Sequence, residues 1–269
     1  MSIGIFGLGT VGNAVHHYYS NKNIPIYIYD KYKVEYNTYN TEKIFDCDII
    51  FICIPSNYDT NKKEYDLNEF HKILQNLHII KYQGAVIIKS TLLPGTSQDF
   101  STKYKLNIIY NPEFLSEKTS IYDYANPKQI ILGKTDTCND DVYNMVVKFN
   151  IENFPDISIS CVNSQEAESC KLFLNSFYAV KVQFFNELYF ISKQFNLDFK
   201  KITHLMTMQG WLNPQHTQVP GTDGEFSYGG KCLPKDAISL LELMNKNNTI
   251  HGILKATIDE NKIFRPENF

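Results

Sequence analysis

Apolar and polar residues follow two different patterns along this chain. In the first half, short and nearly continuous apolar runs are separated by longer segments of helical periodicity. Such runs are typical of strands that are buried on both faces of a sheet. The expected strands are residues 2–6, 25–29, 48–54, 85–88, 108–110, 129–132 and 157–161. Helices are expected up to Tyr19, at 67–79 and at 140–149. This alternation predicts an α/β fold with a doubly wound parallel sheet.

The second half has a helical pattern instead. Residues 164–195 contain neither proline nor glycine, and their apolar residues recur at helical spacing. A helix of about 30 residues is far longer than usual, which suggests a spine between lobes or the axis of a dimer. The apolar residues in question are Leu172, Phe173, Phe177, Val180, Phe184, Leu188 and Ile191. Further helices are expected at 199–208, 234–245 and 250–263, with a polar loop at 210–224.

The first expected strand leads directly into Gly7-Leu8-Gly9-Thr10-Val11-Gly12, after which the helical pattern begins. A GxGxxG between a strand and a helix predicts a Rossmann-type fold that binds a dinucleotide. Gly7 is expected to make the turn, Gly9 to let a pyrophosphate approach, and Gly12 to pack the helix on the strand. Thr10 and Val11 lie in the same loop and complete its expected cofactor contacts.

Asp30 ends the second expected strand, 18 residues beyond Gly12. A carboxylate there suits the ribose hydroxyls and repels a 2′-phosphate, which favours NAD over NADP. Lys31 and Lys33 follow closely and weaken this preference, and Lys33 is itself an expected cofactor contact. The expected domains are an NAD-binding domain at 1–163, a helical central and dimerisation domain at 164–263, and a tail at 264–269.

Three further segments lie where strands are expected to end, which is where open α/β sheets bind ligands. They are Pro55-Ser56, Ser90–Thr96 with its hydroxyl pair Ser90 and Thr91, and Asn111–Glu117. Glu113 and Glu117 are four residues apart, so they would share one face if that segment were helical. A solvated helix face would explain these two acids equally well.

On the long expected helix, Glu168, Lys171 and Asn175 are spaced so that all three share one face. Taken alone, a lysine and an amide beside an apolar stripe can be ordinary surface residues. The loop that follows carries stronger chemical signals.

That loop is Tyr228-Gly229-Gly230-Lys231-Cys232-Leu233-Pro234-Lys235-Asp236. The two glycines allow the backbone to come close to a ligand. Pro234 fits the first turn of a helix, which places Asp236 in that turn and Cys232 near the helix N-terminus. A helix N-terminus and neighbouring cations both favour a thiolate. The alternative for a single cysteine is a buried structural role.

Composition limits the class of protein. The chain has 269 residues, a net charge of −3 and no apolar run near the roughly 20 residues that span a membrane. We expect no secretory signal, no nucleic-acid partner and a cytoplasmic location. The six cysteines form no CxxC pair, and the seven histidines form no HExxH, so neither a disulfide framework nor a metal site is expected.

These segments together resemble the UDP-glucose/GDP-mannose dehydrogenase family. Its motifs are matched by GxGxxG at Gly7–Gly12, STxxPGT at Ser90–Thr96, NPEFLxE at Asn111–Glu117, ExxKxxxNxFxAxKxxFxNE at Glu168–Glu187 and GGxCxPKD at Gly229–Asp236. The resemblance covers nearly the whole chain and is strongest to UDP-glucose 6-dehydrogenases. Members continue with a third domain that binds the nucleotide of the sugar, and this chain stops before it. The family's PDRI is Pro127-Lys128-Gln129-Ile130 here, and Ala237 stands where threonine is usual.

The resemblance implies oxidation of a sugar C6 alcohol to a carboxylate with two NAD. Cys232 would be the nucleophile, and Lys171 with Asn175 would stabilise charge on the C6 oxygen. Asp236, Glu113 and Thr91 would position and deprotonate water, while Glu117 would pair with Lys171 or the substrate. Implied cofactor contacts outside the glycine loop are Asp30, Lys33, Pro55, Ser56, Thr91 and Glu117. Implied substrate contacts are Glu113, Phe114, Leu115, Glu117, Lys171, Asn175, Tyr228, Gly229 and Gly230.

Two alternatives stay open at this point. An NAD-dependent hydroxy-acid dehydrogenase of similar fold would leave Cys232 idle. A non-catalytic NAD-binding or assembly protein would have no use for the six retained catalytic candidates. The wide apolar stripe of the long helix additionally predicts a homodimer, with UDP-glucose as the expected substrate.

Overall fold

A computed structural model of the chain describes residues 1–37 and 41–268. Two compact units are present, Met1–Asn57 with Tyr65–Lys171 and Tyr58–Glu64 with Leu172–Phe269. Phe269, the last residue of the expected tail, lies outside the described residues.

Among the described residues, the first unit is built on a seven-stranded sheet in the order β2-β1-β3-β6-β7-β8-β9. The strands are β1 (Ile3–Phe6), β2 (Ile26–Tyr29), β3 (Ile49–Ile52), β6 (Ala85–Ile88), β7 (Asn107–Tyr110), β8 (Ile130–Lys134) and β9 (Ile159–Asn163). The helices are α1 (Thr10–Ser20), α2 (Thr41–Ile44), α3 (Asn68–Ile79), α4 (Thr96–Tyr104), α5 (Ser120–Ala125) and α6 (Asp140–Asn153), with a 3-10 turn at Val34–Tyr36. The expected α/β fold with helices on both faces of the sheet is confirmed.

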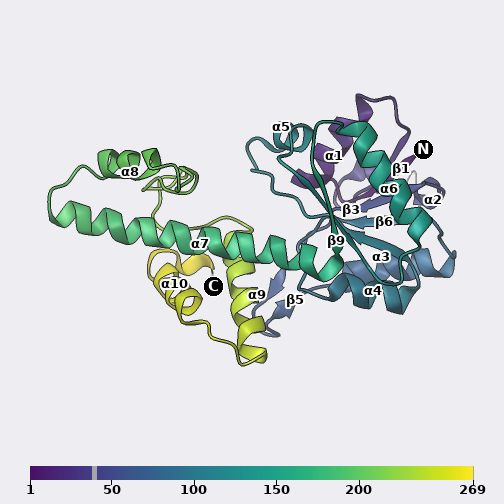
Figure 1. Cartoon of the computed structure of the whole chain (residues 1–269). Coiled ribbons are helices and arrows are strands. Elements are labelled where there is room, and N and C mark those ends of the chain that lie inside the picture. The colour runs from purple at the N-terminus through teal and green to yellow at the C-terminus, as the bar shows by residue number, and fades with distance from the viewer. Residues whose placement is uncertain (38–40, 269) are drawn as a thin grey trace. The chain divides into compact units, whose positions relative to one another are not determined.

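Each face of the sheet has its own hydrophobic core. Helices α1, α5 and α6 lie on one side of the sheet and α3 and α4 on the other (Figure 1). Ile49 and Phe51 of β3 belong to the first core, whereas Ile50 and Ile52 belong to the second. Successive side chains of a strand point to opposite faces, so a strand covered on both sides has to be apolar throughout. This is why the strands appear in the sequence as continuous apolar runs.

Strand β8 departs from the expected parallel sheet. It pairs antiparallel with β7, through Ile109 with Lys134 and Tyr110 with Gly133, and parallel with β9. A parallel neighbour requires a crossover along the whole sheet, usually through a long helix. The chain between β7 and β8 forms only the six-residue helix α5, which packs on α1. Strand β8 therefore starts at the carboxyl end of β7 and runs back alongside it.

The second unit is helical. It contains α7 (Ser164–Gln194), whose first turns belong to the first unit, followed by α8 (Phe199–Met208), α9 (Leu233–Lys246), α10 (Gly252–Phe264) and a 3-10 turn at Pro266–Asn268. The sequence pattern did not indicate the small β4–β5 ladder (Tyr58–Asp59 and Glu64–Tyr65). Its Lys63 forms an ion pair of 3.3 Å with Glu242 of α9.

Helix α7 carries hydrophobic residues that the unit itself does not cover. Leu172 is fully buried, but Phe173, Phe177 and Phe184 are 52%, 56% and 51% exposed.

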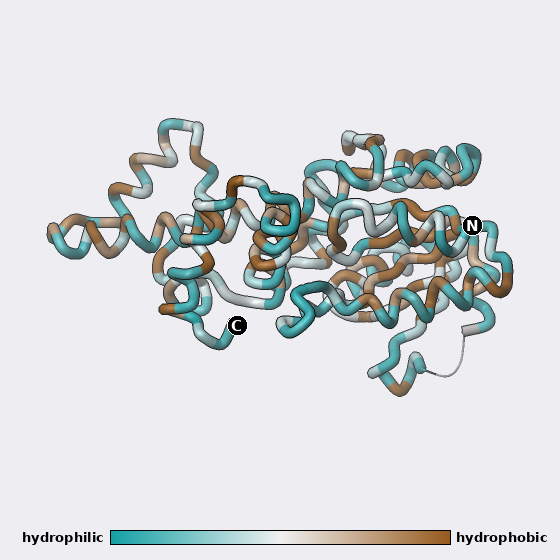
Figure 2. The backbone as a smooth tube through the Cα atoms, turned by 90° about the horizontal axis from the view of Figure 1, so that it is seen from below, coloured by the Kyte–Doolittle hydropathy of each residue, from teal (hydrophilic) through white to brown (hydrophobic). Residues whose placement is uncertain are grey.

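Hydrophobic and hydrophilic positions intermix along the helices (Figure 2). No helix in the described part of the chain combines the length and apolar character needed to cross a bilayer.

Candidate active site

The glycine-rich loop after β1 has the geometry that its sequence predicts. Gly7 has a φ of +90°, which favours glycine, and a side chain there would approach the Cys53 carbonyl oxygen to 2.8 Å. A β-carbon at Gly12 would overlap the carbonyl oxygen of Gly7, whereas one at Gly9 would meet nothing within 4 Å. Gly7 and Gly12 are therefore required for the turn and for helix packing, and Gly9 leaves the backbone accessible.

Asp30 fixes this loop from the end of β2. Its Oδ2 accepts a hydrogen bond of 2.6 Å from the Leu8 N–H, and Oδ1 accepts from the N–H groups of Tyr32 and Lys33. The carboxylate is thus held beside the glycine loop, where an acid is expected to bind ribose hydroxyls. Lys31, one of the two lysines expected to weaken the NAD preference, forms an ion pair of 3.1 Å with Glu69.

The hydroxyl residues at the ends of β3 and β6 are mostly enclosed. Ser56 and Thr91 are buried, and Pro55 is exposed. Ser90 donates a hydrogen bond of 2.5 Å to the Ile54 carbonyl, which joins the chain after β6 to the chain after β3. These positions lie at the carboxyl edge of the sheet, as expected from the order of strands.

Lys171 and Glu113 form the central ion pair of the first unit. Lys171 Nζ lies 3.0 Å from Glu113 Oε1 and donates a hydrogen bond of 2.6 Å to the Glu113 carbonyl. Glu113 Oε2 accepts from the Leu115 N–H at 2.8 Å. The ring of Phe114 lies 5.3 Å from the same ammonium. The lysine and the NPEFL segment are therefore fixed to each other inside one unit.

Glu117 was expected to pair with Lys171 or the substrate; Lys171 pairs with Glu113 instead, and the substrate contact stays a prediction. Residues 111–116 are not helical, so the two acids do not share a helix face. Asp123 accepts hydrogen bonds from the Ser116 N–H and the Thr119 hydroxyl. Glu117 is exposed and lines a hollow beside Tyr18 and Lys22 of α1.

Two buried charged residues in this unit were not among the predicted site residues. Lys89, directly after β6, donates a hydrogen bond of 2.6 Å to Asn111 Oδ1, and burial lowers its pKa to about 8. Glu168 of α7 accepts from the N–H groups of Gly95 and Ser97 at the start of α4, and burial raises its pKa to about 7. Lys89 could have been recognised from the sequence, because it is a lysine directly after the apolar run of β6.

The thiol loop belongs to the second unit. Cys232 is the N-cap residue of α9, Pro234 lies in the first turn and Asp236 follows in that turn, as predicted. The Cys232 side chain is exposed, whereas Asp236 is fully buried. Asp236 Oδ2 accepts a hydrogen bond of 2.6 Å from the Asn175 side chain, and its Oδ1 lies 2.5 Å from Lys235 Nζ.

The two glycines before Cys232 differ from each other. Gly230 has a φ of +81° and open space where a side chain would begin. At Gly229 a β-carbon would lie 2.7 Å from Arg265 Nη1, so a protein side chain occupies the space expected to admit a ligand. Tyr228 is buried, and its hydroxyl has no hydrogen-bond partner in the described residues.

The candidate residues thus form separate groups within each unit. The first unit contains the glycine loop with Asp30 and the Glu113–Lys171 pair, and the second contains Asn175, Asp236 and the thiol loop. Lys171 and Asn175 are one turn apart on α7. Lys171 pairs with Glu113 of the first unit, and Asn175 bonds to Asp236 of the second. Among the described residues, no group of three or more acids, histidines or cysteines could hold a metal ion.

Two family models match this chain. Residues 29–149 match the NAD binding domain of the UDP-glucose/GDP-mannose dehydrogenase family, and residues 165–263 match its central domain. The first unit therefore contains the family's NAD-binding domain.

Individual relatives match about four fifths of the chain. A UDP-glucose 6-dehydrogenase of Campylobacter jejuni is 32% identical over 223 residues, which are 82% of this chain and 54% of the relative. A GDP-mannose 6-dehydrogenase of Pseudomonas aeruginosa is 27% identical over 81% of this chain and 51% of its own length. This chain thus spans about half the length of the curated relatives it matches.

A solved structure shows the same fold. The UDP-glucose dehydrogenase of the archaeon Pyrobaculum islandicum superposes with a TM-score of 0.82 at 20% identity, covering 97% of this chain and 68% of that one. Together with the glycine loop, the Glu113–Lys171 pair and the thiol loop, these matches show that the chain belongs to the UDP-glucose/GDP-mannose dehydrogenase family.

Proposed function

We propose that this protein is an NAD-dependent nucleotide-sugar dehydrogenase that oxidises the C6 alcohol of UDP-glucose to the carboxylate of UDP-glucuronate. One sugar alcohol, two NAD⁺ and one water give one carboxylate, two NADH and three protons. The observation that carries the proposal is the position of Cys232 at the N-terminus of α9, one turn before the buried Asp236 that Asn175 binds. A single-step alcohol dehydrogenase has no need for a nucleophile at this place.

NAD supplies the hydride acceptor for both oxidations. In the second oxidation the Cys232 thiolate adds to the C6 aldehyde, and the resulting thiohemiacetal loses a hydride to become a thioester. Water then hydrolyses the thioester, which releases the carboxylate and restores the thiol. The helix N-terminus favours the thiolate that starts this sequence.

Lys171 and Asn175 are proposed to stabilise negative charge on the C6 oxygen. An ammonium has three N–H donors, and Lys171 places two of them on Glu113, so one is available to a substrate oxygen. Fixed donors aimed at developing charge typically contribute a factor of about 10² to 10³ in turnover. Asn175 is held in place by Asp236, which limits the ways its amide can turn.

Glu113, Asp236 and Thr91 are proposed to position and deprotonate the hydrolytic water. Glu113 already accepts two donors in the first unit, from Lys171 and Leu115, which orients its carboxylate. Phe114, Leu115, Tyr228 and Gly230 are proposed substrate contacts, and Glu117, Ser56 and Lys33 cofactor contacts. We also propose a homodimer through α7, since exposed phenylalanines follow one stripe of that helix.

The test is NADH production by the full chain with a panel of UDP- and GDP-sugars. The proposal predicts that UDP-glucose gives the highest kcat/KM and yields two NADH for each sugar consumed. One NADH per substrate with a small hydroxy acid would support the hydroxy-acid alternative. NAD binding without oxidation of any nucleotide sugar would support the non-catalytic alternative.

A further inference from the structure

Arg265 is the only arginine in the sequence, and the other 25 of its 26 lysine and arginine residues are lysines. It directly follows α10 as its C-cap residue and is 8% exposed. Its Nε donates a hydrogen bond of 2.8 Å to the Phe226 carbonyl, and its Nη2 lies 2.6 Å from Asp223 Oδ2. A planar guanidinium can serve both acceptors at once, which a lysine ammonium cannot do in the same geometry.

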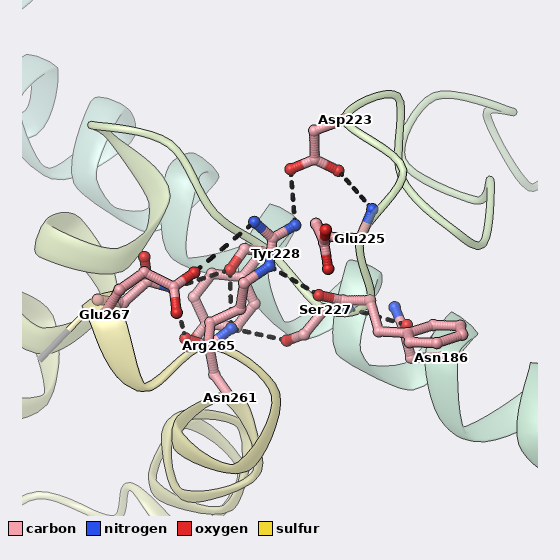
Figure 3. A network of polar contacts seen from close by, with 10 residues as sticks. Asn186, Asp223, Glu225, Ser227, Tyr228, Asn261, Arg265 and Glu267 are labelled. Atoms are coloured by element: carbon pink, nitrogen blue, oxygen red, sulfur yellow. Dashed lines mark hydrogen bonds and ion pairs between the residues drawn. The ribbon is translucent and has the colours of Figure 1, made fainter.

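The residues that Arg265 holds are part of a polar network around the segment before Cys232 (Figure 3). Asn261 of α10 donates hydrogen bonds of 2.6 Å to Ser227 Oγ and 2.8 Å to the Tyr228 carbonyl. From α7, Asn186 Oδ1 accepts from the Ser227 N–H at 2.9 Å. Ser227 itself has a φ of +60°, a conformation that needs such support in a residue with a side chain. The segment is therefore fixed from both helices.

Arg265 also lies directly against the backbone of Gly229. A β-carbon at this position would be 2.7 Å from Nη1 and 3.1 Å from Cζ of the guanidinium. A side chain at residue 229 would have to displace the guanidinium from its present position, from which it bonds to Asp223 and the Phe226 carbonyl. Gly229 is three residues before Cys232, so the guanidinium sets the path of the chain just before α9 begins.

We propose that Arg265 is a positioning residue for the thiol loop. It acts through Asp223, the Phe226 carbonyl and the backbone of Gly229, and it thereby keeps Cys232 at the N-cap of α9. The inference rests on the proposed function for its catalytic meaning, because only a nucleophilic Cys232 needs this placement. The position of the thiol itself can be measured without any turnover.

The experiment compares Arg265→Met and Arg265→Lys with a matched control, Lys255→Met. Lys255 is an exposed cation of α10 that pairs with Asp259. The readout is the rate of iodoacetamide alkylation at Cys232 between pH 6 and 10, determined by peptide mass spectrometry. Cys161, which is also exposed, serves as the internal reference. The charged neighbours Lys231, Lys235 and Asp236 are the same in every variant.

In both Arg265 variants, iodoacetamide is expected to alkylate Cys232 about three- to tenfold more slowly at pH 7 than in wild type. The midpoint of the pH profile should move upward, because the thiol no longer lies at the helix N-terminus that favours its thiolate. Cys161 and the control variant should keep the wild-type profile. Arg265→Lys should not restore the wild-type profile, since a positive charge alone does not replace a planar guanidinium that bonds two acceptors at once. A wild-type Cys232 profile in a folded Arg265→Met protein would overturn the proposal.

If Arg265→Met does not fold, Asp223→Asn provides the test, because it weakens the ion pair while the guanidinium and its bond to Phe226 remain. It should move the Cys232 profile in the same direction by a smaller amount, and an unchanged profile would refute the proposal. NADH production separates this inference from the proposed function. An inactive wild type with a shifted profile in the variants would refute only the function. An active wild type whose Arg265 variants keep both profile and kcat would refute only the positioning.

Discussion

The side-chain amide of Asn175 donates a hydrogen bond of 2.6 Å to Asp236, although 61 residues separate the two in the chain. Both side chains are buried, and Asp236 also forms an ion pair with Lys235. The bond joins α7 to the first turn of α9, which Cys232 caps. One helix thus carries both the proposed charge-stabilising residues and the support for the thiol loop.

Replacement of Asn175 tests this relationship. Asn175→Ala should lower turnover about 10²- to 10³-fold, because it removes a donor proposed to face the C6 oxygen and leaves Asp236 without that partner. NADH production under saturating NAD and sugar measures the effect. Ser169→Ala, at a partly exposed position of α7 whose hydroxyl bonds only to the Gln165 carbonyl, is the control and should retain wild-type turnover. An Asn175→Ala protein with wild-type kcat would contradict the assigned role.

The glycine loop allows a matched pair of substitutions. Gly9→Ala should fold normally, because its β-carbon meets nothing, and should weaken NAD binding by tenfold or more as the methyl group enters the space for the pyrophosphate. Gly12→Ala should weaken NAD binding and also lower the melting temperature, since its β-carbon overlaps the Gly7 carbonyl. Calorimetric titration with NAD and thermal unfolding separate the two effects. Equal NAD affinity in Gly9→Ala and wild type would place the cofactor elsewhere.

Glu168 predicts a pH dependence of stability. Burial raises its pKa in the folded chain to about 7, above the value near 4.5 of an unfolded chain. The folded state therefore binds the proton more strongly, and the associated stability is fully present below pH 4.5 and is lost as the pH rises through 7. Urea unfolding of wild type should show a loss of about 1 to 3 kcal/mol between pH 5 and 8 that is reduced in Glu168→Gln. Parallel pH dependences in the two proteins would contradict this assignment.

The exposed stripe of α7 predicts self-association. Phe173 and Phe177 lie one turn apart and are each more than half exposed. Phe177→Asp should convert the proposed homodimer into a monomer, because a charge in an apolar interface is costly to bury. Light scattering at micromolar concentration measures the mass, and Lys193→Asp near the end of α7 is the control. A monomeric wild type would exclude the dimer.

Much of the fold could be predicted because the central strands β1, β3 and β6 are buried along their whole length. The runs that include Ile49–Ile52 and Ala85–Ile88 have no polar positions to obscure them. Strand direction is not encoded in such a run, so the antiparallel β8 was not foreseen. The boundaries of the long helix were clear because no proline or glycine interrupts it.

The individual site residues were recognisable from motifs, but their partners were not. Lys171 could pair with either Glu113 or Glu117 as far as spacing shows, and the folded chain pairs it with Glu113. The contact of Arg265 with Gly229 joins residues 36 positions apart, and no periodicity relates them. Lys89 was missed, and Glu168 was noted only for its helix face, because burial, which gives both their altered pKa values, is a property of the folded chain.

The most direct test of the account is the number of NADH formed per UDP-glucose by wild type and by Cys232→Ala. The account predicts two NADH per sugar for wild type and a turnover lower by about 10³-fold or more in Cys232→Ala, with Cys161→Ala close to wild type. One NADH per sugar in wild type, or Cys232→Ala turning over at the wild-type rate, would contradict the role of Cys232 as the nucleophile.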